Sequence, residues 1–263
     1  YILNLPTVLL SFIAAILGGG GSLFLLFLFR RKFKNDLFTD NHEVSSVFFN
    51  ALGLLYTVLV SFVVIATWTS YSEADLNVEV EANQIHDLFI TTGGLPFEYR
   101  DEARNLIIEY LNSVAKGDWE YLEKGERNPE SSETLIKLWN YYLQIRNIKS
   151  SEQQSIYSQS LIRLDEITKS RRFRVQSSEH HIPSILWVVI ISGSISTVVF
   201  SLFFKGKNIV LQSIVTATFA MINSLIILLI LILDHPFTGD SAITNEPLVD
   251  VVSFIKDYLS KNP

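Results

Sequence analysis

The sequence contains no cysteine, and its charged residues are few. The missing thiol excludes disulfides, thiolate nucleophiles and zinc or iron–sulfur sites built on cysteine. Only 18% of the residues are charged and the net charge is −6, so there is no basic surface of the kind that binds nucleic acid. We therefore expect no nucleic-acid partner.

Sequence motifs of the common enzyme classes are also missing. The chain has no GxSxG, no GxxxxGK[ST], no HExxH, and no GxGxxG following a strand pattern. Adjacent histidines occur once, at His180 and His181, which is weak evidence for a metal site. The sequence thus predicts neither an enzyme nor a cofactor.

Long uncharged apolar runs are abundant instead. Four of them, at residues 5–29, 47–68, 184–204 and 209–233, contain no Asp, Glu, Lys or Arg. Each meets the roughly 20 residues that a helix needs to cross a bilayer. We predict an all-α integral membrane protein whose partner is the lipid bilayer. Its segments are residues 1–68 with two spans, a helical extramembrane domain at 69–183, two spans at 184–233, and a tail at 234–263.

Basic residues near the ends of the spans predict an orientation. They lie in the loop between spans one and two and in the loop between spans three and four: Arg30, Arg31, Lys32, Lys34, Lys205 and Lys207. Such short basic loops face the cytoplasm, which places residues 69–183 on the opposite, extracytoplasmic side.

The second span is predicted to continue as a helix beyond the membrane. Apolar residues follow a heptad seam that is broken only at Asp75; they are Tyr71, Val78, Ala82, Ile85 and Phe89. Acidic residues on this helix stand at the height of the RRFR segment at 171–174 if the third span also continues outward. We predict a stalk in which Glu73, Asp75, Glu79 and Glu81 face Arg171, Arg172 and Arg174, with Glu79 and Arg172 as the representative pair; the alternative is two solvated faces that never touch.

The rest of the insert also has a helical period. Residues 97–117 place Tyr99, Ala103, Leu106, Ile107, Tyr110 and Leu111 on one face, and Gly117 is expected to end that helix. A second helix follows the polar loop at 125–133.

Each span carries one stripe of small and polar residues at near i+4 spacing. The stripes are Ser11, Ala15, Gly18 and Ser22; Asn50, Gly53, Thr57 and Ser61; Gly193, Thr197 and Ser201; and Ser213, Thr216 or Ala217, Ala220 and Ser224. Small residues favour helix packing, and polar ones can also line a wetted path. The pore-lining candidates are the second set, Asn50, Gly53, Thr57 and Ser61. A path without ionisable groups would select ions by size, by hydroxyl and amide dipoles, or by a hydrophobic gate.

The motif LDHPFTGD closes the fourth span. Pro236 disfavours helix at His235, and Asp234 is costly to draw into hydrocarbon, so the span should end here. Gly239 then permits a turn. We predict a structural corner in which Asp234 or His235 is hydrogen-bonded and no metal is held; a metal site is the alternative. Beyond it, Val249, Val252, Ile255 and Leu259 indicate an amphipathic helix lying on the extramembrane domain.

Three segments of the sequence resemble the bestrophin-like family of bacterial and plant membrane proteins: NALGLLYTVLVSFVVIATWTSYSEA, GDWEYL and LDHPFTGD. The resemblance implies a homo-oligomer, a pentamer in bestrophins, that conducts inorganic ions, chiefly anions, through four-span subunits in a bacterial-type plasma membrane or a thylakoid membrane. Bestrophins keep their large domain in the cytoplasm, whereas the charge distribution here places it outside. Passive ion conduction is the expected function; the alternative is a non-conducting scaffold or sensor whose helical domain binds a partner protein.

Overall fold

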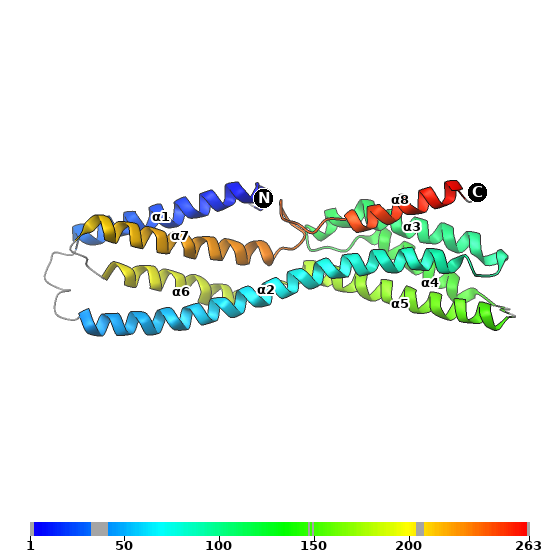
Figure 1. The fold of residues 1–263 in the computed structure, drawn as a ribbon, viewed down its shortest axis with the longest axis horizontal. Coiled ribbons are helices and arrows are strands. Elements are labelled where there is room, and N and C mark those ends of the chain that lie inside the picture. Colours follow the sequence, from blue (N-terminus) through cyan, green and yellow to red (C-terminus); the bar gives the residue numbers. More distant parts are fainter. Residues whose placement is uncertain (1–2, 33–41, 147, 149, 204–207, 262–263) are drawn as a thin grey trace. The chain divides into compact units, whose positions relative to one another are not determined.

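The computed structural model describes residues 3–32, 42–146, 148, 150–203 and 208–261. Within these residues it contains helices only, in the order α1 (Thr7–Lys32), α2 (His42–Thr92), α3 (Phe97–Leu122), α4 (Pro129–Gln144), α5 (Ser151–Glu179), α6 (Ser184–Phe203), α7 (Ile209–Leu233) and α8 (Glu246–Lys261) (Figure 1). The predicted all-α class is confirmed. Lys34, Lys205 and Lys207, which entered the orientation argument, lie outside the described residues.

The chain divides into two compact units. Unit 1 comprises residues 1–70 and 182–241, and unit 2 comprises residues 71–181 and 242–263. The tail after residue 241 therefore belongs with the helical insert, and the long helix α2 contributes residues to both units.

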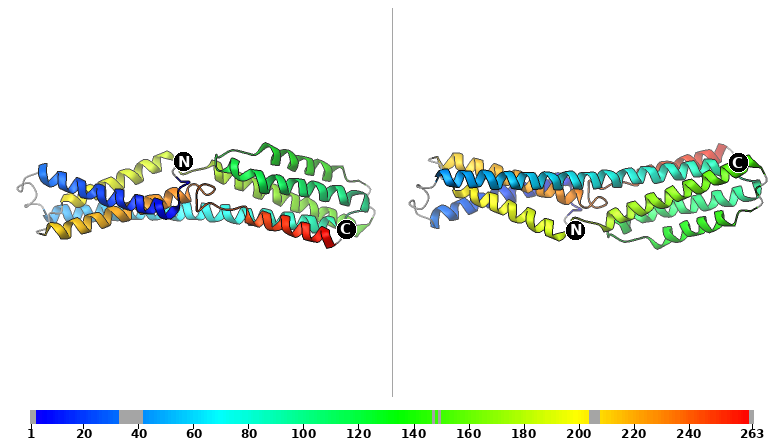
Figure 2. Two further views of the ribbon diagram at one scale, coloured as in Figure 1. Left: turned by 90° about the horizontal axis from the view of Figure 1, so that it is seen from above. Right: turned by 90° about the horizontal axis from the view of Figure 1, so that it is seen from below.

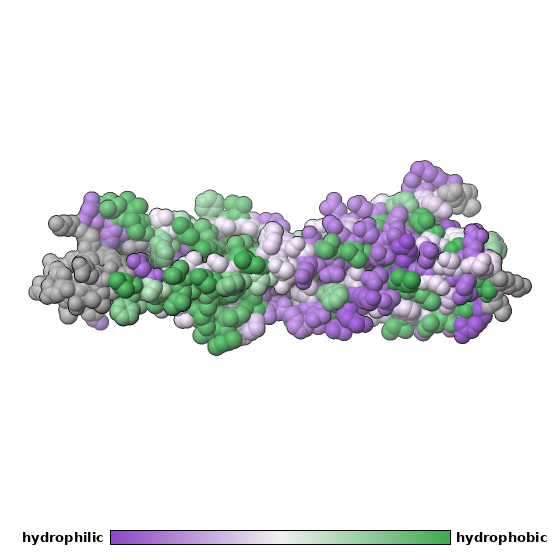
Figure 3. All heavy atoms as spheres, turned by 60° about the horizontal axis from the view of Figure 1, so that its bottom comes forward, coloured by the Kyte–Doolittle hydropathy of each residue, from purple (hydrophilic) through white to green (hydrophobic). Residues whose placement is uncertain are grey.

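Unit 1 contains the apolar helices. Four helices of the described chain are long and apolar enough to cross a membrane: α1, the part of α2 from residue 47, α6 and α7. Figure 3 shows hydrophobic residues covering most of the visible surface of unit 1 and hydrophilic ones covering most of unit 2. This contrast is the one expected between a part solvated by lipid and a part solvated by water.

Small residues set the closest contacts in unit 1. Helices α1 and α7 pack against each other; they lie side by side in Figure 1 and cross in the left view of Figure 2. A Cβ added at Gly18 would lie 2.2 Å from the Ser224 hydroxyl oxygen and 2.8 Å from the Ala220 carbonyl oxygen. A Cβ at Gly193 of α6 would lie 2.5 Å from the ring of Tyr56 on α2. Glycine is therefore required wherever these backbones approach.

Unit 2 has a conventional hydrophobic core. The core joins α2, α3, α4, α5 and α8 through Ala82, Ile85, Phe89, Ile107, Leu138, Leu164 and Leu248, among others. Of the predicted inward residues of α2, Val78, Ala82, Ile85 and Phe89 are buried and Tyr71 is half-buried. On the predicted face of α3, Ala103, Ile107, Tyr110 and Leu111 are buried, and Tyr99 and Leu106 are half-buried.

Three details of the prediction for unit 2 are wrong. Helix α4 begins at Pro129, inside the segment 125–133 that was predicted as a loop. Helix α3 does not end at Gly117 but continues to Leu122. Gly117 instead lets the Asn128 side chain approach, since an added Cβ would lie 2.8 Å from the Asn128 Nδ2 atom. That side chain caps α4, where its Oδ1 accepts the Glu130 backbone N–H at 3.0 Å.

The inward face of α8 also differs from the prediction. The helix buries Leu248, Val251 and Ile255, whereas Val249 and Leu259 of the predicted face are 43% and 38% exposed. The packing of α8 on the insert was predicted and is present. In the segment before it, Asn245 donates to the Ala115 carbonyl oxygen at 2.7 Å, and the Trp119 indole donates to the Ile243 carbonyl oxygen at 2.7 Å.

Candidate functional site

The small-residue stripes of α1, α6 and α7 are used for packing. Gly19 and Ser22 of α1, Thr197 of α6, and Thr216 and Ala220 of α7 are all buried within unit 1. The close approach of Gly18 to Ala220 and Ser224 joins two of these stripes directly. For these three spans, packing between helices accounts for the small residues.

The stripe of α2 differs from the other three. Asn50, Thr57 and Ser61 are exposed, and a Cβ added at Gly53 would meet no atom within 4 Å. The Ser61 hydroxyl donates to the Thr57 carbonyl oxygen at 2.8 Å, so its oxygen still has acceptor capacity outward. The buried face of α2 in this unit contains Val60 and Val63 instead. Asn50, Thr57 and Ser61 are thus left uncovered by the described residues of unit 1, and no described atom packs against the open side of Gly53.

The side-chain amides of the spans show the same contrast. Gln212 is buried and accepts a hydrogen bond from the Arg30 guanidinium. Asn223 is buried and donates to the Phe219 carbonyl oxygen at 3.1 Å. Asn50, by comparison, faces outward. The side-chain amides of α7 are hydrogen-bonded within the subunit, whereas the amide of Asn50 on α2 is exposed on the surface of the subunit.

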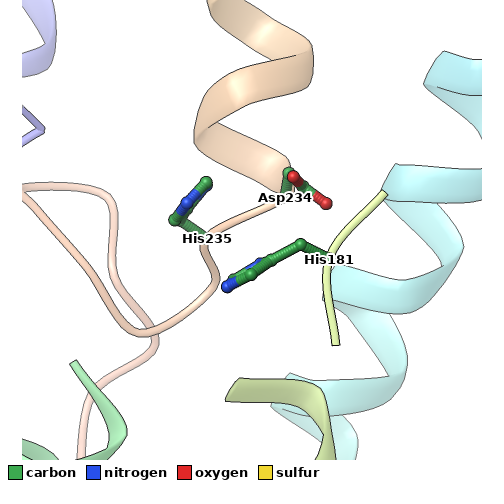
Figure 4. Close-up of side chains that lie close together, drawn as sticks. All are labelled: His181, Asp234 and His235. Carbon is green, nitrogen blue, oxygen red and sulfur yellow. The ribbon is translucent and has the colours of Figure 1, made fainter. Parts of the chain in front are cut away.

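The end of α7 forms the corner of unit 1. The Asp234 carboxylate accepts the Ile182 backbone N–H at 2.7 Å, and Nδ1 of His235 lies 3.0 Å from the Leu231 carbonyl oxygen. Figure 4 shows both side chains at the end of α7, together with His181, which directly precedes Ile182 in the chain. The Asp234 carboxylate therefore satisfies a backbone donor in the segment that leads into α6.

The segment after Pro236 is held against the start of the chain. Gly239 has φ of +88°, and a Cβ there would lie 2.2 Å from the Leu3 carbonyl oxygen. The Asp240 carboxylate accepts the Thr7 backbone N–H at 3.2 Å at the beginning of α1. These contacts are those of a structural corner. That Asp234, His235, Pro236 and Gly239 serve this role without a metal stays a prediction.

An ionic cluster occupies the centre of unit 2. Arg174 is fully buried and binds Glu81 through two hydrogen bonds of 2.8 and 3.1 Å, and it binds Asp118 at 2.8 Å. Tyr110 donates to Glu81 at 2.7 Å, and Ser131 donates to Asp118 at 2.6 Å. Every member is buried, so one guanidinium faces two carboxylates in a medium of low dielectric; a second cation, Arg171, donates to Ser131 at 2.8 Å beside them.

The cluster alters the pKa of its members. Burial lowers the pKa of Arg174, but the neighbouring carboxylates of Glu81 and Asp118 outweigh it and raise the pKa above its ordinary value. Burial, followed by the charge of Glu81, raises the pKa of Tyr110 well above its usual range. Arg174 therefore stays charged and Tyr110 stays neutral at any physiological pH.

The predicted stalk pair is corrected by this cluster. Glu79 and Arg172 are both exposed, and no ion pair joins them within the chain. The acidic residue that faces α5 is Glu81, and the arginine that faces α2 is Arg174. Glu79 lies on the outward side of α2 because it precedes Glu81 by two positions, about half a helical turn. Asp118 was missed because it follows Gly117, where the sequence pattern appeared to end a helix.

The comparisons with known proteins agree on one fold. A family model described as "Bestrophin-like domain" matches residues 16–248. Two solved structures of bacterial bestrophin homologue variants from Klebsiella pneumoniae are similar to the chain, with TM-scores of 0.70 and 0.69. The first is 14% identical and the match covers 95% of this chain and 98% of that one; the second is 15% identical and covers 97% and 96%.

No curated protein matches the sequence. At such low identity the solved structures establish the fold alone, whereas the family model spans most of the chain. With its four apolar helices, the chain is an integral membrane protein and belongs to the bestrophin-like family.

Proposed function

We propose that the protein is an oligomeric channel for passive ion conduction, in which α2 of each copy lines a shared central path. The observation that carries the proposal is the stripe Asn50, Gly53, Thr57 and Ser61, in which the three polar side chains are exposed and Gly53 has open space beside it. In lipid, exposed hydroxyl and amide groups lack hydrogen-bonding partners and are costly. A water-filled path between copies would hydrate them, because it is the one environment beside a span that offers water.

The same stripe supports the kind of selectivity that we propose. It contains no ionisable group, so an ion in the path would meet hydroxyl and amide dipoles and the apolar side chains next to them. Leu54 and Val58, which are 66% and 47% exposed, border the stripe and could form a hydrophobic constriction. Anions are the proposed ions, on the strength of the family to which the chain belongs.

A flux measurement tests the proposal. The purified protein in liposomes should pass ions, and Thr57→Leu should reduce the flux several-fold without altering assembly, because it replaces a polar group of the path with a bulkier apolar one. Thr218→Leu is the matched control, since Thr218 is exposed on α7 outside the stripe. Its flux should equal that of the wild type.

The opposite result would support a different function. If folded oligomers pass no ions under varied pH, voltage and calcium, the non-conducting scaffold or sensor becomes the better account. Equal loss of flux in Thr57→Leu and Thr218→Leu would also contradict the proposal, because it would show that the position on α2 has no special role.

We also propose that unit 2 lies on the extracytoplasmic side of a bacterial-type plasma or thylakoid membrane. The support is the cluster of Arg30, Arg31 and Lys32 at the end of α1. Because the chain lacks cysteine, single cysteines report the sidedness cleanly. Glu126→Cys in unit 2 should react with an impermeant thiol reagent from outside, and Lys32→Cys should not; the reverse pattern would invert the orientation.

A further inference from the structure

Unit 2 carries an acidic groove between α2 and α8, with a volume of about 590 Å³. Four exposed carboxylates border it: Asp75, Glu79, Glu246 and Asp250. No Lys or Arg of the described residues forms an ion pair with any of them. Apolar side chains, among them Val251 and Phe254, also line the groove. It therefore combines an apolar surface with an uncompensated negative rim.

Helix α5, on the other side of α2 from α8, carries an exposed surface with a positive charge instead of negative ones. Figure 1 shows α2 between α8 and α5 in this unit. On α5, Ile162 and Phe173 are 63% and 53% exposed, and Arg172 is exposed with no ion pair among the described residues. We call Ile162, Arg172 and Phe173 the α5 stripe. The unpaired guanidinium is the complement of the groove in charge, and the aromatic ring beside it matches the apolar side chains of the groove in polarity.

The heights of the two surfaces match. Arg163 pairs with Asp87 and Arg174 pairs with Glu81, so α5 runs antiparallel to α2. Because Arg174 lies opposite Glu81, the preceding residue of α5, Phe173, lies at the height of Ala82 on α2. By the same count, Arg172 lies at the height of Asn83. Ala82 and its neighbour line the groove. In a ring that turns about an axis along α2, the α5 stripe of one copy therefore meets the groove of the next at the correct height.

We propose that the α5 stripe of one copy seats in the acidic groove of the next copy, in a head-to-tail contact that closes into a ring. Two different surfaces on opposite flanks of one helix make a heterologous contact, which builds rings rather than two-fold dimers. Phe173 packs against Val251 and Phe254, and Arg172 faces the rim carboxylates. The inference rests on the proposed function only in placing α2 towards the common axis.

Interchain cross-linking tests the contact. Asn83 lines the groove, and Gln176 is exposed on α5 one helical turn from Arg172, so neither substitution removes a charge or the aromatic ring. The double variant Asn83→Cys with Gln176→Cys, treated with a short bismaleimide in native membranes, should give a ladder of dimers, trimers and larger species up to the closed ring.

The single variants define the symmetry of the contact. Neither Asn83→Cys nor Gln176→Cys alone should give more than traces of dimer. As a matched control, Asn83→Cys with Glu152→Cys should give no ladder, because Glu152 is exposed at the start of α5, about 30 Å along the helix from Arg172. Strong dimers from either single variant would indicate a two-fold contact and overturn the proposal, as would the absence of a ladder from folded oligomers.

Charge reversal gives a second readout. Arg172→Glu should reduce the ladder at least tenfold, and the further change Glu79→Arg should restore a substantial part of it. Calcium or magnesium that protects Asn83→Cys from maleimide, with no ladder in the double variant, would assign the groove to a cation and overturn the proposal. A ladder without ion flux would refute the channel alone, and flux without a ladder would refute this contact alone.

Discussion

Unit 1 and unit 2 are both built from packed helices, but different forces hold them together. Unit 1 relies on small residues at close helix contacts, as at Gly18 and Gly193, and fewer of its described apolar residues are buried than in unit 2. Unit 2 buries a large apolar core around an ionic cluster centred on Arg174.

The difference follows from the solvent of each unit. Lipid tails are as apolar as leucine, so apolar burial gives helices in a bilayer little reason to associate, and close van der Waals contact replaces it. In water the apolar core of unit 2 supplies the driving force, and the buried charges mainly specify which helix faces meet. A surface of unit 1 that has polar groups but no packing partner, as on α2, therefore needs a separate explanation.

Removal of the central charge should give the largest effect. Arg174→Met would leave the Glu81 and Asp118 carboxylates buried without their cation and should destabilise unit 2 by about 3–5 kcal/mol. Arg127→Met is the control, because Arg127 pairs with Glu179 on the surface, where water screens the charges, so its removal should leave the unfolding midpoint nearly unchanged. Thermal unfolding of the full chain in detergent would compare them. Equal midpoints for the two variants would contradict a central role for the cluster.

Alkaline pH should also weaken unit 2. Burial raises the pKa of Tyr142 to about 12 from its usual 10.0, although its hydrogen bonds with Thr92 and Ser160 act the other way. Because the pKa of Tyr142 is higher in the folded state, folding favours the neutral phenol. The neutral phenol therefore contributes its full share to the free energy of unfolding below about pH 10, and this share is lost towards pH 12 at about 1.4 kcal/mol per pH unit.

The variant Tyr142→Phe isolates that dependence. It loses the contact between Tyr142 and Thr92, so it should be less stable at neutral pH. Its unfolding midpoint should nevertheless fall less steeply than that of the wild type between pH 10 and 12. Parallel pH curves for the two proteins would show that Tyr142 does not titrate in this range.

Glycine contacts test unit 1. Gly18→Ala places a methyl group 2.8 Å from the backbone oxygen of Ala220, which cannot move alone, so we expect a loss of about 1–3 kcal/mol. Gly20→Ala meets no atom within 4 Å and should be neutral or slightly stabilising, since alanine favours a helix. Thermal unfolding in detergent distinguishes them. If both variants behave alike, small-residue packing is not what holds α1 to α7.

The corner should give the smallest effect. Asp234→Asn weakens the hydrogen bond from the Ile182 N–H and should cost about 1 kcal/mol. Elemental analysis should find no stoichiometric metal, and a chelator should not shift the unfolding midpoint. Stoichiometric metal that is lost together with stability in Asp234→Asn would make the corner a ligand site.

Hydropathy and periodicity were sufficient to predict most of the fold. The four apolar runs became helices, and the inward faces of α2 and α3 followed their apolar spacing. The apolar spacing did not predict the buried face of a helix where two neighbouring faces were equally apolar. In α8, valines at 249, 251 and 252 allow two neighbouring stripes, and only the packing of unit 2 selects the one with Val251.

Polar partners were harder to predict than apolar faces. The sequence does not show which of the two acids, Glu79 or Glu81, faces α5. Tertiary contacts decide which side of α2 is buried, and that side contains Glu81. Asp118 looked like a residue beyond a helix end, because glycine commonly ends helices. The stripe of α2 was predictable as a pattern, but its distinction from the other stripes required the structure, which shows those buried or partly buried and the polar side chains of this one exposed.

The central claim, that the exposed stripe of α2 faces a water-filled path, is tested most directly by cysteine accessibility during conduction. In this cysteine-free chain, Thr57→Cys in liposomes should react with a charged, water-soluble thiol reagent, and the reaction should block the ion flux. Thr218→Cys, exposed on α7, should react slowly because it faces lipid, and its flux should persist. Unreactive Thr57→Cys in a conducting protein, or modification without block, would contradict the account.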